Sequence, residues 1–340
     1  MMTLRRRLTA SLLTGVTAVL DIVITHYNES WETGKKLFWM IELQRCIDFK
    51  QIRVTVVNDG GDRLPDHELM KFSYPIEQLD IVHGGISKAR NSGIDHATEP
   101  FIMFCDFDDT FTNIYALRDI LTILPCDYDM LWTQLLVEDY LDNHELIYMT
   151  PDRQKFVFIH GKVYRREYLL KERIRFNEEM SFQEDSLFNA TITARTDFKR
   201  IGQIKSPSPP YVWIRRQNSV TNSGRDDEAE YWHFRRNLEV AAENEPDPDK
   251  YRGMVTRTAY DAFYMIFGRR ISFGMKSRIL SEFIPWITPR LQLFGNVSNE
   301  IMKKIVDVSR YELLDPGEEL QDDPQTVKAW LDKITTQEEN

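Results

Sequence analysis

The stretch from Phe101 to Asp109, FIMFCDFDD, decides the fold, because five consecutive apolar residues lead directly into three closely spaced carboxylates. A strand this apolar is typical of a sheet that helices cover on both faces. In such sheets, ligands bind beyond the carboxyl ends of the strands. We therefore expect Asp106, Asp108 and Asp109 to lie at a ligand-binding edge.

The sequence on either side repeats the same kind of unit. Runs rich in β-branched residues at 19–27 and 52–57 predict strands, and the segment between them has the apolar spacing of a helix. A further strand is predicted at 79–83 and a further helix at 86–98. This alternation predicts an α/β fold with a doubly wound, mostly parallel sheet.

Polar residues follow three of the predicted strands. Parallel strands end at a common edge of the sheet, so residues that follow them in the sequence are brought together. We expect one crevice to be formed by three segments: Thr25–Glu29, Asn58–Asp62 and Asp106–Asp109.

The second half of the chain has a different pattern. Segments 130–141 and 145–150 resemble an antiparallel pair, and 156–170 runs from a strand into a helix. Prolines make 206–213 extended, the polar residues after it predict an exposed loop, and helical patterns dominate from about Glu228. We therefore expect three parts: an N-terminal extension at 1–19, an α/β domain at 20–225 and a helical region at 226–340.

Composition excludes some classes of function. A net charge of −10 argues against general binding to nucleic acid, which requires many cations against the phosphates. The three cysteines form no CxxC pair and are widely spaced, which predicts neither a zinc site nor a disulfide framework. A reducing compartment fits this cysteine usage.

The N-terminus resembles a secretory signal, because Arg5–Arg7 precede an apolar run. That run contains Thr, Ser and Gly and leads directly into the first predicted strand, so we expect an extension rather than a cleaved signal. No other stretch approaches the roughly 18 apolar residues of a membrane span. We expect a cytoplasmic protein without a transmembrane segment, and leave open attachment to a membrane surface.

The carboxylates of Asp106, Asp108 and Asp109 have two interpretations. Like charges held this close are costly to bury, and a divalent cation with oxygen ligands, Mg²⁺ or Mn²⁺, compensates them. Alternatively, one of them caps the next helix by accepting hydrogen bonds from free amides. We expect Asp109 to be the one that acts partly as such a structural cap.

Two glycine turns extend the predicted site. In VVNDGGD, Asp59 and Gly60 lie where a planar ligand can approach the backbone, although an ordinary Asp-Gly turn explains the same pattern. In HGGISKARNSGI, Ser87, Arg90 and Asn91 open a helix whose amides suit a nucleotide or phosphate. A capped surface helix with solvated basic residues is the alternative.

Four motifs in order, ITHYNES, VVNDGGD, SKARNSGI and CDFDD, closely resemble the family 2 glycosyltransferases of the GT-A fold. The resemblance covers roughly residues 20–222, and ordered motifs are more specific than any single one. Asn58 replaces the first Asp of the usual pair and Gly61 replaces its Ser, which leaves Asp59 as the expected base contact. The resemblance implies a nucleotide-sugar donor, most simply a UDP-sugar.

The resemblance extends to FIHGKVYRREYLL, which is similar to the Gly-Lys-x-Tyr segment that precedes a Glu-Asp pair in this family. That pair is Glu184 and Asp185 here, and Asp185 is the implied general base, since an inverting transfer needs a carboxylate at the acceptor hydroxyl. Both residues also suit the acidic first turn of a helix. His160, Lys162 and Glu184 are expected on the acceptor side, although a single His is more often simply hydrogen-bonded.

These inferences assign the metal to Asp106 and Asp108. YVWIRRQNSVT resembles the family segment that closes over the diphosphate, although an exposed loop explains it equally. The expected donor-binding residues are Thr25, Tyr27, Asn28, Glu29, Asp59, Gly60, Ser87, Arg90, Asn91, Asp106, Phe107, Arg215, Ser219 and Thr221.

The predicted function is metal-dependent, inverting transfer of a sugar to an acceptor hydroxyl in glycan or surface polysaccharide synthesis. A glycan, a lipid-linked molecule or another hydroxyl compound remains open as acceptor. A nucleotidyltransferase and a noncatalytic sugar-nucleotide or carbohydrate-binding protein of the same fold are the alternatives.

Overall fold

The computed structural model describes residues 18–140, 145–150, 158–180, 182–215 and 227–268, with residues 278, 281–283, 285–287, 289, 290 and 293. The chain divides into two compact units. The first comprises Met1–Asp185 and Asp197–Ser219, and the second comprises Ser186–Thr196 and Val220–Asn340. The predicted boundary at residue 225 falls outside the described residues and stays a prediction.

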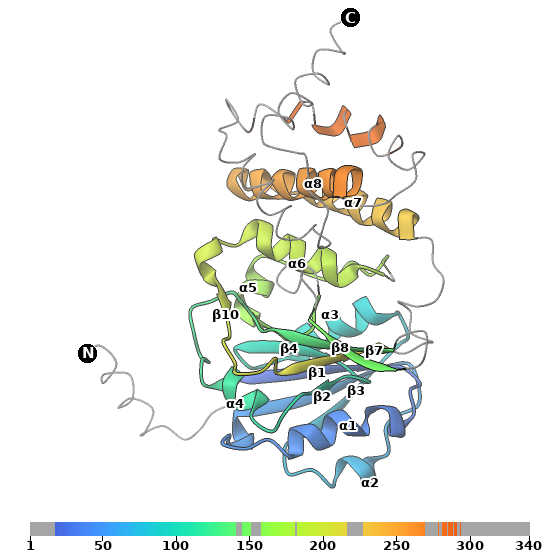
Figure 1. Cartoon of the computed structure of the whole chain (residues 1–340), viewed down its shortest axis with the longest axis vertical. Helices are drawn as coiled ribbons and strands as arrows, with labels where there is room; N and C mark the ends of the chain where they lie inside the picture. The colour runs from blue at the N-terminus through green and yellow to red at the C-terminus, as the bar shows by residue number, and fades with distance from the viewer. Residues whose placement is uncertain are drawn as a thin grey trace, which may run out of the picture. The chain divides into compact units, whose positions relative to one another are not determined.

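A seven-stranded sheet forms the centre of the first unit (Figure 1). Its neighbours are parallel except for β9, which runs antiparallel to β4 and β6. The predicted α/β fold with a mostly parallel sheet is therefore confirmed. In sheet order the strands are β10 (Ile201–Gln203), β6 (Met130–Trp132), β9 (Lys162–Arg165), β4 (Phe101–Asp106), β1 (Leu20–His26), β2 (Ile52–Asp59) and β3 (Ile76–Ile81).

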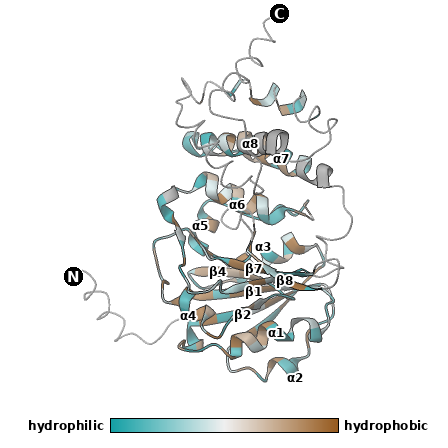
Figure 2. Ribbon diagram, in the orientation of Figure 1, coloured by the Kyte–Doolittle hydropathy of each residue, from teal (hydrophilic) through white to brown (hydrophobic). Residues whose placement is uncertain are grey.

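Helices cover both faces of this sheet, with α1 and α2 on one face and α3 and α5 on the other (Figure 1). Side chains alternate along β1, so Ile22 and Ile24 join the core with Phe38 of α1, whereas Val23 faces Gly93 of α3. Most residues of β1 and β4 are accordingly hydrophobic (Figure 2). The helical segments are α1 (Trp31–Glu42), the 3₁₀ turn η1 (Phe49–Gln51), α2 (Asp66–Leu69), α3 (Ile86–His96), α4 (Ala116–Leu121), α5 (Arg166–Lys171) and the 3₁₀ turn η2 (Phe198–Arg200).

A second, four-stranded sheet begins directly after the acidic segment. Its order is β5 (Thr110–Phe111), β11 (Tyr211–Ile214), β7 (Leu135–Tyr140) and β8 (Leu146–Met149). The antiparallel pair predicted from 130–141 and 145–150 is confirmed for β7 and β8. Its first residues, Met130–Trp132, instead form β6 of the large sheet, because the chain leaves extended pairing at Thr133 and Gln134.

The second unit is helical in its described residues. It contains most of α6 (Glu184–Arg195), α7 (Asp227–Glu243) and α8 (Pro248–Gly268). Gly253 of α8 lies so close to α6 that an added Cβ would be 2.2 Å from the carbonyl oxygen of Ala194. Within the described part of the chain, no helix is long and apolar enough to cross a membrane.

Phe107 anchors the acidic segment in the core. Its ring is 2% exposed and lies 4.7 Å from the ring of His26 and 6.0 Å from that of Phe38, between centroids. Gly34 of α1 makes room for this ring, because a Cβ on Gly34 would lie 2.2 Å from Phe107 Cζ. Packing of α1 therefore fixes the backbone that carries Asp106 and Asp108.

Replacing Gly34 with Ala tests this packing. Alanine favours a helix by about 1 kcal/mol over glycine, but overpacking against Phe107 costs about 1 to 3 kcal/mol, so we expect a net loss of stability. Urea unfolding measures it, with Lys36→Ala on the exposed face of α1 as the control that stays within about 0.5 kcal/mol of wild type. A Gly34→Ala protein more stable than wild type would contradict the close approach.

Candidate active site

The three polar segments predicted to converge do so at one edge of the large sheet. Thr25 of β1 pairs with Val57 of β2 on one side and with Asp106 of β4 on the other. The turns that follow these three neighbouring strands therefore lie side by side. The predicted convergence of the three segments is therefore confirmed, and a crevice between them stays a prediction.

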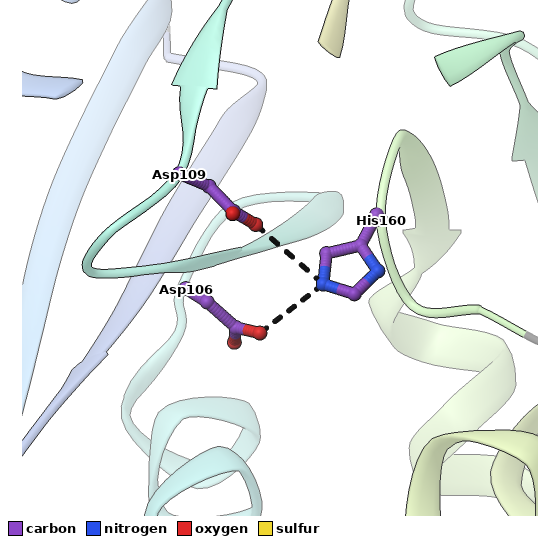
Figure 3. A group of neighbouring side chains, drawn as sticks. All are labelled: Asp106, Asp109 and His160. Carbon is purple, nitrogen blue, oxygen red and sulfur yellow. Dashed lines mark hydrogen bonds and ion pairs between the residues drawn. The ribbon is translucent and has the colours of Figure 1, made fainter. Parts of the chain in front are cut away.

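Asp106, Asp109 and His160 form the centre of this edge (Figure 3). His160 Nε2 lies 3.1 Å from Asp106 Oδ2 and 3.5 Å from Asp109 Oδ2. The imidazole is held by stacking on Trp213, with 5.1 Å between ring centroids and 11° between ring planes. One donor atom from each of the three residues lies within 4.8 Å of the others, which is a spacing that could hold a metal ion.

Asp109 is also bound firmly by β11. Its Oδ2 accepts a hydrogen bond from the Tyr211 hydroxyl at 2.8 Å, and its Oδ1 accepts one from the Ile214 amide at 2.9 Å. The side chain is fully buried. Asp109 therefore ties the two sheets together, a structural task of the kind expected for it, although its partners belong to a strand rather than to a helix end.

Arg90 of α3 supplies the positive charge beside Asp106. Its guanidinium donates to Asp106 Oδ1 at 2.9 Å and to Glu184 Oε1 at 2.7 Å, and only 3% of its side chain is exposed. Charge-assisted bonds of this kind are strong when both partners are shielded from water. Arg90 thus links the acidic end of β4 to the Glu184–Asp185 pair.

The charges around the cluster set unequal proton affinities. Burial acts to raise the pKa of Asp106, but Arg90 and His160 outweigh it and hold that pKa below its usual range. Burial raises the pKa of Asp109 well above its usual range, and the nearby carboxylates of Asp106 and Asp108 add to this. Burial acts to lower the pKa of His160, yet the two aspartates raise it overall. Asp106 is therefore the carboxylate of this group that stays ionised most readily, whereas Asp109 and His160 both hold a proton more strongly than usual.

The donor set fits a divalent metal. Carboxylate oxygens with one imidazole nitrogen suit Mn²⁺, whereas Mg²⁺ prefers oxygen alone. Asp108, predicted as a ligand, lies half-buried in the turn after β4 and is not among the three clustered residues. Its role as a ligand stays a prediction, whereas the contribution of Asp109 and His160 to the group depended on the tertiary structure.

The side chain of Asp59 accepts hydrogen bonds from the protein's own backbone. Its two carboxylate oxygens accept hydrogen bonds from the amides of Gly84 and Gly85, each at 2.8 Å, and Oδ2 lies 2.9 Å from His83 Nδ1. Gly60 has φ of 76°, and an added Cβ would lie 2.7 Å from the amide nitrogen of His83. Asp59 therefore shapes the loop after β3, and its contact with a base stays a prediction.

An aromatic pair lies at the exposed end of this loop. Tyr27 and His83 stack with 4.3 Å between centroids and 19° between planes, and they are 45% and 54% exposed. His83 was not predicted as a site residue, although its place just before the Gly84–Gly85 turn at the end of a predicted strand was a usable signal. Tyr211 and Trp213 were missed as well, because nothing local connects them with Asp109 or His160.

Several predicted donor-binding side chains bond inside the protein. The side chain of Asn91 donates a hydrogen bond to the carbonyl of Phe176 and accepts one from its amide, each at 2.9 Å. Ser87 donates to the carbonyl of Met180 at 3.2 Å, and the carbonyl of Gly61 accepts from Asn58 at 2.7 Å. These side chains hold the loops around the edge.

The turn after β1 is organised in the same way. Asn28 has φ of 60° and its side chain accepts from the Asp62 amide at 3.2 Å, while Glu29 accepts from the Tyr27 amide at 2.7 Å. The ring of Phe107 is buried, so only its backbone can face a donor. Thr25 is buried at the end of β1.

The acceptor-side residues approach the same cluster. Asp185 Oδ2 accepts from the Ile159 amide at 3.3 Å, one residue before His160, and the charge of Asp185 acts on both His160 and Lys162. Arg215 bonds Asp139 of β7 at 2.7 Å. Ser219 and Thr221 lie outside the described residues.

The family model described as Glycosyl transferase family 2 matches residues 21–173, which contain the strands, the acidic segment and His160. Residues 21–173 therefore resemble glycosyl transferase family 2, as the motifs predicted. The predicted resemblance is confirmed over this part of the chain.

Two curated relatives of this chain come from Bacillus subtilis (strain 168). The minor teichoic acid biosynthesis protein GgaA is 27% identical over 227 residues, covering 60% of this chain and 49% of GgaA. The uncharacterized glycosyltransferase EpsJ is 25% identical over 206 residues, covering 53% of this chain and 59% of EpsJ. The chain thus spans about half of the length of these relatives.

A solved structure shares the fold of this chain. S. aureus TarS 1–349 in complex with UDP-GlcNAc superposes with a TM-score of 0.60 at 18% identity, covering 87% of this chain and 88% of TarS 1–349. At this identity the likeness shows the fold, which is the predicted GT-A arrangement with helices toward the C-terminus.

The hydrogen bond from Tyr211 to Asp109 can be removed by Tyr211→Phe. We expect a loss of about 1 to 3 kcal/mol in the free energy of unfolding, because a buried carboxylate oxygen loses its donor. Denaturant unfolding measures this, and Tyr140→Phe at a half-exposed ring is the matched control that stays near wild type. Equal stability of the two variants would show that the Tyr211 bond contributes nothing.

Proposed function

We propose that this protein is a metal-dependent inverting glycosyltransferase that moves a sugar from a UDP-sugar to an acceptor hydroxyl during synthesis of a surface glycan or polymer. The observation that carries the proposal is the meeting of Asp106, Asp109 and His160 with the Ile159–Asp185 contact at one sheet edge. An acidic group that can hold a metal and a separate accessible carboxylate are the two parts that such a transfer needs.

The metal would be held by Asp106 and Asp108, with His160 as a further ligand. Asp109 lies in the same group, but its oxygens already accept hydrogen bonds from Tyr211 and Ile214. A bound Mn²⁺ or Mg²⁺ neutralises charge on the departing nucleoside diphosphate. Arg90 keeps Asp106 ionised and oriented for this task.

The nucleotide would lie along the ends of β1 and β2. The exposed ring of Tyr27 offers a face on which a base can stack, and Asp59 keeps the adjoining Gly84–Gly85 turn in place. The donor bound in TarS is UDP-GlcNAc, which supports a UDP-sugar here. The remaining predicted donor contacts that the structure describes are Thr25, Asn28, Glu29, Gly60, Ser87, Asn91, the Phe107 backbone and Arg215.

Asp185 would act as the general base. It is half-buried at the start of α6, and the Ile159 amide fixes one of its oxygens at 3.3 Å. A carboxylate placed in this way can take the proton of an acceptor hydroxyl as the hydroxyl attacks the anomeric carbon. A single displacement inverts that centre, so an α-linked donor gives a β-linked product.

The acceptor is proposed from the relatives. GgaA is named for minor teichoic acid biosynthesis, which supports a hydroxyl of a surface polymer as acceptor. We assign the transfer chemistry to residues 20–225 and assign no part of it to the helical region at 226–340.

A panel of nucleotide sugars with Mn²⁺ tests the function. Release of UDP from a UDP-sugar supports glycosyl transfer, and product mass spectrometry with polymer extracts as acceptor identifies the linkage. Release of pyrophosphate would identify a nucleotidyltransferase instead. Binding without turnover would identify a noncatalytic sugar-nucleotide protein.

Asp185→Asn removes the proposed base without changing side-chain size. We expect transfer to fall at least about 10²-fold, because general-base catalysis typically contributes that much, while affinity for UDP in calorimetry stays unchanged. Asp127→Asn, at an exposed position of the first unit, is the control and keeps full activity. Loss of UDP binding in Asp185→Asn would contradict the assignment.

Removal of divalent metal gives an independent check. Chelation with EDTA should stop UDP release, and added Mn²⁺ should restore it, because the diphosphate charge is otherwise uncompensated. In Asp106→Asn the Mn²⁺ concentration needed for half-maximal activity should rise. Full activity in EDTA would exclude the metal from the reaction.

A further inference from the structure

Lys162 carries an ionisable side chain at a position that is completely buried. It begins β9, its relative exposure is 0%, and its neighbours in β9 are the buried Val163 and Tyr164. Lysine is rarely buried completely, because removing an ammonium from water is costly. An apolar residue would fill this site with less loss of stability.

The ammonium of Lys162 closes a short turn. Its Nζ donates a hydrogen bond to the carbonyl of Phe158, so residues 158–162 form a ring fastened by this side chain. Gly161 makes the turn possible with φ of 66°, and its carbonyl accepts from the Thr133 amide at 2.9 Å. We call residues 158–162 the Lys162 turn.

The Lys162 turn presents two groups to two carboxylate sites. The Ile159 amide donates to Asp185 Oδ2 at 3.3 Å. The next residue, His160, places Nε2 at 3.1 Å from Asp106 Oδ2. Adjacent residues of one turn therefore contact both the proposed base and the acidic end of β4, and a change in the turn moves both contacts together.

We propose that Lys162 is a positioning residue for sugar transfer: by fastening the Lys162 turn, it holds Asp185 through the Ile159 amide and directs His160 toward Asp106. This inference rests on the proposed function, since it acts through Asp185. In this role Lys162 acts through the turn rather than by the direct acceptor-side contact that the sequence predicted. Burying this charge lowers the stability of the fold, and in return the turn holds Asp185 and His160 in place.

Lys162→Met tests the role, because methionine has a similar length and no charge. We expect UDP release from UDP-GlcNAc, or from the UDP-sugar found active in the panel, to fall about 10²-fold in kcat, as small misplacements of reacting groups do. The KM for the donor should change less than about threefold, since Lys162 makes no donor contact. The thermal unfolding midpoint should stay equal or rise, because a buried ammonium is removed.

The control is Lys171→Met at an exposed position of α5, which should match wild type in kcat and in unfolding midpoint. A second comparison adds Lys162→Met to Asp185→Asn. If Lys162 acts through Asp185, the second substitution should lower the residual rate less than about threefold, because effects on one unit are not additive.

Three results overturn the proposal. They are an unchanged kcat in Lys162→Met, a lowered unfolding midpoint or failure to fold that accompanies the lost activity, and full additivity with Asp185→Asn. A wild-type protein that releases no UDP from any donor would instead refute the proposed function. That result is distinct from the three results above, which concern Lys162 alone.

Discussion

Negative charge at the buried end of β4 is the constraint on which this protein depends. The side chain of Asp109 is fully buried and that of Asp106 is 26% exposed, so an ionised carboxylate here needs partners supplied by the fold. Arg90 comes from α3 and His160 from the turn before β9, and the two approach Asp106 from elements far apart in the sequence. The unequal pKa values of the two aspartates follow from this uneven supply of positive charge.

The same constraint explains the packing around the site. Phe107 is driven into the core beside Gly34, while Asp109 is fixed by the hydroxyl of Tyr211 and the amide of Ile214. The carboxylate of Asp109 therefore helps to join the four-stranded sheet to the large sheet. The acidic segment is fixed on both sides of Asp108, which limits the positions that Asp106 can take.

Donor and acceptor chemistry are connected through a small number of side chains. Arg90 bonds both Asp106 and Glu184, and the Lys162 turn contacts both Asp106 and Asp185. Each connection joins the end of β4 to the start of α6. In the proposed reaction this geometry holds the general base at a fixed position relative to the departing diphosphate. A single displacement requires such a fixed position.

The sequence by itself determined the alternation of strands and helices, the mostly parallel sheet and the edge where the motifs meet. These follow from short-range apolar periodicity and from the rule that parallel strands end together. Only the tertiary structure decided the partners: Asp109 bonds Tyr211 across 102 positions, and Asp106 meets His160 across 54. Such contacts depend on strand order and side-chain direction, which no local pattern records. For the same reason the sequence favoured Asp108 beside Asp106, whereas folding gathered Asp109 and His160 around it.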